Sequence, residues 1–292
     1  MRIGVRVPNA GPLPAEIGIA ALARSAEAAG FDSLWVSDHV VMPASFSSRY
    51  PFAADGRATW PSDTPYVDAL IALALIAAVT ERATLGTAVL VLPLRHPIVV
   101  AKQLASLDTC SGGRLCLGVG AGWLREEFDA LGVPFESRGS RLDEWIELLR
   151  ECWTGAPRAR AGTHYSLPDG VLCLPTPAHE VPVLIGGHSK PALRRAGRHG
   201  DGWLAQQSLD RIDTDEIEDA VDVMRGAADD EGRDSFRGEV VLRIVDSAGR
   251  SGDVARRLPE LARAGVDEVI VDVAWSDGDP AADYERMSAA VA

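Results

Sequence analysis

The stretch PVLIGGHSKPALRRAGRHGDGWLAQ, residues 182–206, contains the repeating unit of the fold. An apolar run over 182–186 predicts a strand, and apolar positions at helical spacing predict a helix over 190–199. A second apolar run predicts another strand over 202–206. Neither run alternates with polar residues, which is typical of parallel strands that are covered on both faces. The stretch therefore predicts a strand–helix–strand unit with parallel strands.

The same unit recurs along the rest of the chain. The further predicted strands cover residues 2–7, 33–37, 84–91, 115–119, 239–245 and 267–273. The further predicted helices cover residues 14–29, 66–80, 97–110, 138–153, 213–231, 252–264 and 280–291. Eight strands, each followed by a helix, predict an α/β fold, a closed (β/α)8 TIM barrel that forms one domain over residues 1–292. An open doubly wound sheet is the main alternative, because one strand more or fewer would change the architecture.

Two long loops interrupt the regular spacing. Residues 42–65 follow the second predicted strand, and residues 154–181 precede the fifth. Both are rich in Pro and Gly, and long loops of this kind are either lids and binding loops or ordinary surface excursions. The first loop contains Phe46, Tyr50 and Trp60. These aromatic residues favour the wall of a binding pocket.

The composition of the chain excludes several classes of function. Its net charge is −13 and it has no basic run, so nucleic acid and anionic membranes are poor candidates as partners. Hydrophobic residues make up 47% of the chain, which predicts a globular core. No signal-peptide core is visible at the N-terminus, and no apolar run is long enough to span a membrane. Four scattered cysteines without a C-x-x-C pair indicate reduced thiols and a cytoplasmic protein.

The segment GFDSLWVSDHV, residues 30–40, ends a predicted strand with an acid beside a base. Active sites of parallel barrels lie at the C-terminal strand ends, so Asp38 and His39 are expected on the rim of the site. Imidazole suits proton transfer near neutral pH, and the carboxylate of Asp38 could orient it. Adjacent strand residues point to opposite faces, so both side chains face the site only if a turn begins there. A purely structural role for His39 is the alternative.

Glycines follow the fourth and fifth predicted strands. LGVGAGW covers residues 117–123, and IGGHSKPAL covers residues 185–193 ahead of a predicted helix. Unshielded backbone N–H groups and a helix N-terminus suit a phosphate group. Tight turns also require glycine, so that interpretation remains open. The spacing lacks the third glycine of the dinucleotide fingerprint, which disfavours a Rossmann fold.

Other chemistries fit the strand ends poorly. A metal-dependent hydrolase needs several His and Asp ligands from different strands, yet only His39 and His188 stand at predicted strand ends. No metal site is therefore predicted. A glycosidase needs two suitably placed acids, and the glycine-rich fourth strand end offers none.

At this level of detail the chain resembles the bacterial-luciferase-like superfamily, in the branch of probable coenzyme F420-dependent oxidoreductases. The resemblance covers nearly the whole chain and weakens after about residue 205. It is carried by GFDSLWVSDH (30–39), LGTAVLVLPLRHP (85–97), SGGRLCLGVGAGWLREEF (111–128) and PVLIGGHSKPALRRAGRHGDGW (182–203). These blocks together are specific for the superfamily and less specific for F420 over FMN.

The resemblance implies a site for a deazaflavin ring. A cis peptide bond in the third strand, placed by the match of GTAV at Ala88–Val89, would support the back of that ring. Asp38 and His39 would lie near its reactive edge. The backbone of two segments would contact the chain and phosphate of the cofactor: Gly120, Ala121 and Gly122, with Gly186, Gly187 and His188.

The implied activity is hydride transfer between F420 and a small organic substrate, such as an enone, an imine, or an alcohol and carbonyl pair. His39 would assist the accompanying proton transfer. Two alternatives remain: an FMN-dependent luciferase-like monooxygenase, and a flavin- or deazaflavin-binding protein without turnover. The resemblance also makes a homodimer an expectation, while Arg243 and Asp246 in the C-terminal third receive no role.

Overall fold

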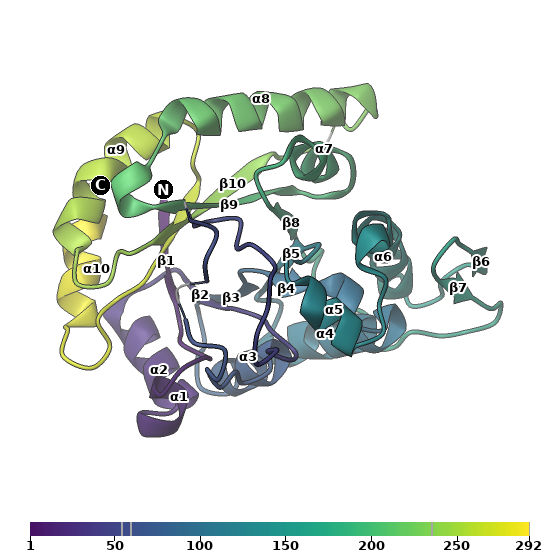
Figure 1. Cartoon of the computed structure of the whole chain (residues 1–292), viewed down its shortest axis with the longest axis horizontal. Helices are drawn as coiled ribbons and strands as arrows, with labels where there is room; N and C mark the ends of the chain where they lie inside the picture. The colour runs from purple at the N-terminus through teal and green to yellow at the C-terminus, as the bar shows by residue number, and fades with distance from the viewer. Residues whose placement is uncertain (54, 59, 235, 292) are drawn as a thin grey trace.

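Eight parallel strands close into a barrel in the computed structural model, which describes residues 1–53, 55–58, 60–234 and 236–291 (Figure 1). Each strand pairs with the next, β1 pairs with β11, and pairing of β3 with β5 completes the ring. The TIM barrel is confirmed and the open sheet is excluded. The barrel strands are β1 (Arg2–Arg6), β2 (Ser33–Val36), β3 (Thr84–Thr87) with its continuation β4 (Leu90–Val91), β5 (Leu115–Gly120), β8 (Val183–Gly186), β9 (Gly202–Ser208), β10 (Glu239–Val245) and β11 (Glu268–Val271).

Helices surround the barrel and follow its strands in order (Figure 1). The predicted helix over 14–29 is divided at Gly18, whose φ of 89° is not helical. The predicted helix over 66–80 begins only at Ala69, because the carboxylate of Asp68 accepts the N–H groups of Leu70 and Ile71 and caps it. The helices are α1 (Leu13–Glu16), α2 (Ile19–Ala29), α3 (Ala69–Ala77), α4 (Pro97–Ser111), α5 (Arg125–Ala130), α6 (Arg138–Trp153), α7 (Lys190–His199), α8 (Thr214–Asp230), α9 (Ser251–Arg263) and α10 (Pro280–Ser288).

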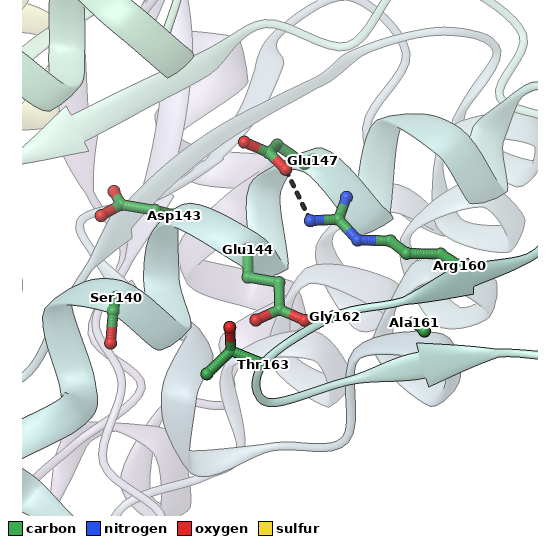
Figure 2. A pocket seen from close by; sticks show the side chains of 8 residues that line it. All are labelled: Ser140, Asp143, Glu144, Glu147, Arg160, Ala161, Gly162 and Thr163. Carbon is green, nitrogen blue, oxygen red and sulfur yellow. Dashed lines mark hydrogen bonds and ion pairs between the residues drawn. The ribbon is translucent and has the colours of Figure 1, made fainter.

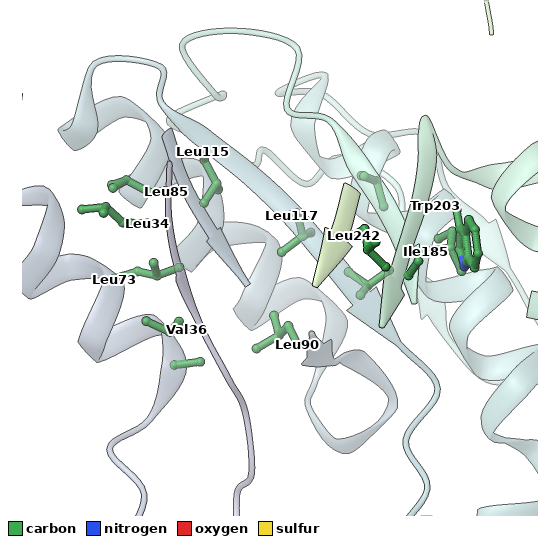
Figure 3. Packing of buried hydrophobic residues seen from close by; sticks show 14 of the residues in the cluster. Leu34, Val36, Leu73, Leu85, Leu90, Leu115, Leu117, Ile185, Trp203 and Leu242 are labelled. Atoms are coloured by element: carbon green, nitrogen blue, oxygen red, sulfur yellow. The ribbon is translucent and has the colours of Figure 1, made fainter. Parts of the chain in front are cut away.

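Most of the hydrophobic core lies between the outer face of the barrel and its helices. Leu34, Leu117 and Trp203 point outward from three strands into this layer (Figure 3). All four residues of β2 and all six of β5 are buried, which explains why their sequences do not alternate with polar residues. The same packing fixes both strands, so the residues that follow them start from rigid positions.

The inside of the barrel is built in layers, because every second strand residue points inward. One layer is apolar and consists of Trp35, Ala88, Cys116, Leu184, Leu204, Val241 and Ile270. Two residues further along their strands, toward the C-terminal ends, Gln206 and Arg243 form part of the next layer. Asp272 follows β11 in the same way and pairs with Arg6 of β1. The floor below the barrel mouth is therefore charged on the side of β9, β10, β11 and β1.

The second long loop, residues 154–181, lies over the outer faces of α4 and α6. Its hairpin of β6 (Arg160–Ala161) and β7 (Ser166–Leu167) packs beside α6, where an ion pair joins Arg160 to Glu147 across an acidic depression (Figure 2). Glu144 of α6 accepts the backbone N–H groups of His164 and Tyr165. These contacts fix the hairpin outside the barrel and identify this loop as a surface excursion.

The helices in the described part of the chain are short or carry polar residues among their apolar ones. None of its helices combines the length and the apolar character that crossing a membrane requires.

Candidate active site

Asn9 fixes the end of β2, where the candidate site begins. Its amide nitrogen donates to the carbonyl oxygens of Ser37 and Val67 at 2.7 and 2.8 Å, and its amide oxygen accepts the Ser37 N–H at 3.0 Å. Asn9 is completely buried, so these hydrogen bonds are shielded from water. They join the ends of β1 and β2 to the segment before α3 and place residues 38 and 39 at the C-terminal end of the barrel.

Among the described residues, the carboxylate of Asp38 has its hydrogen bonds with Arg95 and Val91 and none with the imidazole of His39. This carboxylate forms a bidentate ion pair with Arg95, with both N–O distances at 2.7 Å, and accepts the N–H of Val91 at 3.0 Å. The expectation that Asp38 orients His39 is therefore wrong. The two neighbouring side chains point in different directions, and the carboxylate of Asp38 is paired with the guanidinium of Arg95. Asp38 instead ties β2 to β4 and to the segment after it.

Glu127 of α5 is the partner of His39. One carboxylate oxygen lies 3.0 Å from His39 Nδ1, and the other accepts the N–H groups of Val40 and Val41 at 2.6 and 3.2 Å. A carboxylate can only accept, so in the neutral imidazole this contact places the proton on Nδ1 and leaves the lone pair on Nε2. Both side chains are almost buried, at 9% and 2% exposure. The pair forms a carboxylate–imidazole dyad at the barrel mouth.

Sequence reasoning missed α5 and hence the role of Glu127. The signal in the sequence was two acids in the first turn, Glu126 and Glu127, followed by a glycine stop at Gly132. A helix of six residues has too little periodicity to be recognised by its apolar pattern alone.

Aromatic rings surround His39. Tyr66 packs edge-on against it with ring centroids 5.1 Å apart, and Trp60 and Trp123 lie at 6.1 and 6.2 Å. The loop residues Phe46 and Tyr50 extend this cluster by packing on Trp123. The first long loop, of which positions 54 and 59 lie outside the described residues, thus covers the mouth of the barrel with aromatic side chains.

Glu126, the other acid of α5, binds the same loop. Its carboxylate accepts the N–H of Ser47 at 2.6 Å, the N–H of Ser48 at 3.2 Å, and both serine hydroxyls. Slight burial raises the pKa of Glu126, but the hydrogen bonds from Ser47 and Ser48 stabilise the charged form more and lower the pKa to about 2. The two adjacent acids of α5 therefore hold the histidine and the loop that covers it.

Replacing Glu126 by Gln is expected to loosen the loop around Ser47 and Ser48. The pKa is depressed from its ordinary value of 4.5, so the contribution of the carboxylate is present above pH 4.5 and disappears as the pH falls toward about 2. Hydrogen exchange at neutral pH should show faster exchange of residues 44–50 in the variant. Asp129→Asn on the exposed face of the same helix is the control. Equal exchange in both variants would contradict the anchoring role.

The predicted cis peptide bond is present at Ala88–Val89. The side chain of Val89 lies between two glycines, since a Cβ atom added at Gly120 or at Gly186 would come within 2.7 Å of a Val89 methyl group. Glycine at these two positions is thus required by packing. Val89, between β3 and β4, therefore packs together with the glycines that end β5 and β8, and we call Val89, Gly120 and Gly186 the glycine platform.

Two further glycines of these loops are required by backbone conformation. Gly122 has φ of 85° and Gly187 has φ of 116°, both in the region that other residues rarely adopt. Ala121, which stands between Gly120 and Gly122, is half-buried. Gly122 and Gly187 are half-buried as well, so the backbone groups of these three residues are partly exposed at the mouth. The tight-turn interpretation of the glycine loops is correct for these positions.

Replacing Gly122 by Ala is expected to destabilise the fold by ~1–3 kcal/mol, through backbone strain and overpacking. The new Cβ would lie 2.7 Å from the ring of Phe128 and 2.8 Å from Val91. Urea unfolding measures the effect. The matched control is Gly226→Ala inside α8, where the added Cβ meets nothing within 4 Å and should raise stability by ~0.5–1 kcal/mol. A Gly122→Ala variant as stable as this control would refute the packing argument.

Both ring nitrogens of His188 are used within the protein. Nε2 accepts the N–H of Gln206 at 3.0 Å, and Nδ1 lies 2.9 Å from the carboxylate of Glu216. The imidazole therefore bridges β8 to β9 and α8, and only the backbone of His188 is available for a ligand. Ser189 begins α7 directly afterwards by capping it.

Comparisons with known proteins agree with this architecture. An uncharacterized protein of Mycobacterium tuberculosis is 35% identical over 250 residues, covering 86% of this chain and 83% of that protein. An F420-dependent glucose-6-phosphate dehydrogenase of Nakamurella multipartita is 36% identical over 190 residues, covering 64% of this chain and 51% of that protein. The structure of an F420-dependent secondary alcohol dehydrogenase with an F420–acetone adduct shares the fold, with a TM-score of 0.78, 18% identity, and coverage of 100% of this chain and 99% of that one.

A family model described as luciferase-like monooxygenase matches residues 6–286. This range includes the barrel from the end of β1 to α10, with both glycine loops and the histidine dyad. The chain belongs to the luciferase-like monooxygenase family.

Proposed function

We propose that the protein is an F420-dependent oxidoreductase that transfers a hydride between the deazaflavin and a small organic substrate. The observation that carries this proposal is the placement of the His39–Glu127 dyad and the glycine platform at the same end of the barrel. Two classes of relative support F420 as the cofactor: the sugar-phosphate dehydrogenase and the secondary alcohol dehydrogenase both carry F420 in their names.

The residues at the barrel mouth fit such a cofactor. A flat ring requires a surface with few protruding side chains, and of the three residues of the platform only Val89 carries one. The backbone of Gly120, Ala121 and Gly122 and that of Gly186, Gly187 and His188 would hold the chain and phosphate. The second of these segments leads into the N-terminus of the ten-residue helix α7, whose dipole favours a negative charge.

His39 is the group that would move a proton. When bound, F420 donates the hydride to a substrate carbon or accepts it from one. Nε2 of His39 accepts a proton from a substrate hydroxyl in the oxidising direction, and it returns the proton in the reducing direction. The carboxylate of Glu127 stabilises the imidazolium that forms, and the rings of Trp60, Tyr66 and Trp123 keep water away.

Anaerobic turnover of reduced F420 tests this function. The protein is mixed with reduced F420 and with separate pools of enones, imines, and aldehydes with ketones. The proposal expects oxidation of F420 that requires both the protein and one of the pools. F420 binding without oxidation by any pool would contradict catalysis and favour a binding protein. Activity with reduced FMN and oxygen alone would favour the monooxygenase.

A further inference from the structure

Arg243 is an incompletely paired cation inside the barrel. Its Nε is buried and has no hydrogen-bond acceptor within the described residues. Its Nη1 lies 3.5 Å from the carbonyl oxygen of Ala88 and 3.4 Å from Oε1 of Gln206, both at the outer limit of a hydrogen bond. Arg243 as a whole is half-buried, so its guanidinium is incompletely paired yet still accessible, and such a cation suits an anionic ligand.

The charges around Arg243 leave one positive charge in excess. Asp272 is the carboxylate that stabilises the charge of Arg243 most, but it is already paired with Arg6. Although burial opposes ionisation, Arg6 and Arg243 together lower the pKa of Asp272, so it carries its full negative charge. Burial in turn lowers the pKa of Arg243 from 12.5, as expected for a cation that lacks a close counter-ion. Two cations therefore face one anion.

A hydroxyl group from the mouth is linked to this charge through Gln206. Tyr50 of the long loop accepts a hydrogen bond from Nε2 of Gln206 at 3.0 Å, and Oε1 of the same amide lies 3.4 Å from Nη1 of Arg243. Burial raises the pKa of Tyr66 to about 12, which keeps its hydroxyl protonated and able to donate. Since Tyr50 packs on Trp60, and Trp60 and Tyr66 both pack on His39, these rings form one wall that connects the charged group to the proton-transfer group.

We propose that Arg243 and Gln206 bind a carboxylate of the substrate, so that the substrates of this enzyme are small organic acids. The inference rests on the proposed function: the carboxylate is one end of the substrate, and the carbon that exchanges the hydride, near His39, is the other. A substrate that lies along the wall of Tyr50 and Tyr66 places its carboxylate at Arg243 and its reacting carbon near His39. The glycine platform remains for the cofactor.

Calorimetric titration with carboxylate probes tests the site. The probes are benzoate and acetate, and benzamide is the neutral control of the same shape as benzoate. We expect benzoate to bind the wild type at least tenfold more tightly than benzamide. Arg243→Gln should lose at least tenfold in benzoate affinity, Arg243→Lys should retain part of it, and Arg256→Gln on the exposed face of α9 should retain all of it. Circular dichroism checks that each variant is folded.

Three results would overturn the inference: no binding of either carboxylate to the wild type, equal binding of benzoate and benzamide, or unchanged benzoate binding by folded Arg243→Gln. A parallel titration of the same variants with F420 separates this site from the cofactor site. Loss of F420 binding with benzoate binding unchanged would assign Arg243 to the cofactor and also overturn the inference. Failure of F420 to bind the wild type, with carboxylate binding intact, would contradict the proposed function alone.

Discussion

Replacing His39 by Ala is expected to reduce turnover by ~10²–10⁴-fold, the usual loss when a positioned acid–base group is removed. F420 affinity should change by less than about threefold, because the cofactor site that we propose is formed by the glycine loops and does not include the imidazole. We expect a large effect because the contact with Glu127 orients the imidazole of His39 and, in the neutral ring, leaves the lone pair on Nε2 for the proposed proton transfer. Steady-state kinetics with the active substrate pool and a separate F420 titration measure the two quantities.

The control for this experiment is His199→Ala, a change in α7 at the outside of the barrel. It should leave both turnover and F420 affinity unchanged. Full activity of His39→Ala with a verified substrate would remove His39 from the mechanism. A loss of F420 binding as large as the loss of turnover would make His39 part of the cofactor site and not a proton-transfer residue.

Replacing Asp38 by Asn is expected to lower the free energy of unfolding by ~3 kcal/mol or more, because it leaves the buried guanidinium of Arg95 without its bidentate partner. The side chains of Asp38 and Arg95 are 0% and 11% exposed, so water cannot replace the lost contact. Asp68, the other acid near Arg95, is 3.3 Å away and partly exposed, and it compensates only in part. Urea denaturation at neutral pH measures the change.

Glu136→Gln is the matched control, since it breaks the exposed ion pair with Arg125. Exposed pairs contribute ~0–1 kcal/mol, so this variant should be nearly as stable as the wild type. If Asp38→Asn were equally stable yet inactive, Asp38 would act in the chemistry itself. We expect the opposite: the activity of Asp38→Asn should fall in proportion to the fraction of the protein that is folded.

The barrel was predictable because its strands are buried on both faces and its helices end at glycine or begin at caps. The strand over 239–245 was predicted with its observed bounds, and that over 115–119 lacks only Gly120. The cis bond at Ala88–Val89 was implied by resemblance and is confirmed. The predicted strand over 84–91 is divided at that bond into β3 and β4, which no apolar pattern indicates.

The pairing of charges could not be read from the sequence. Asp38 and His39 are adjacent, yet their partners Arg95 and Glu127 stand 57 and 88 residues further along the chain. Such partners are chosen by the closed barrel, which brings the segments after β2, β4 and β5 together at one end. Arg243 is a similar case: an arginine within an apolar strand is recognised as a site residue only when the barrel interior is known.

Separate titrations of the purified wild-type protein with F420 and with FMN test the central claim most directly. Fluorescence of the tryptophans at the mouth, Trp60 and Trp123, provides the signal. We predict saturable binding of F420 with a Kd at least tenfold lower than that of FMN, and the same preference in His39→Ala. Tighter binding of FMN, or no saturable binding of F420, would contradict the account.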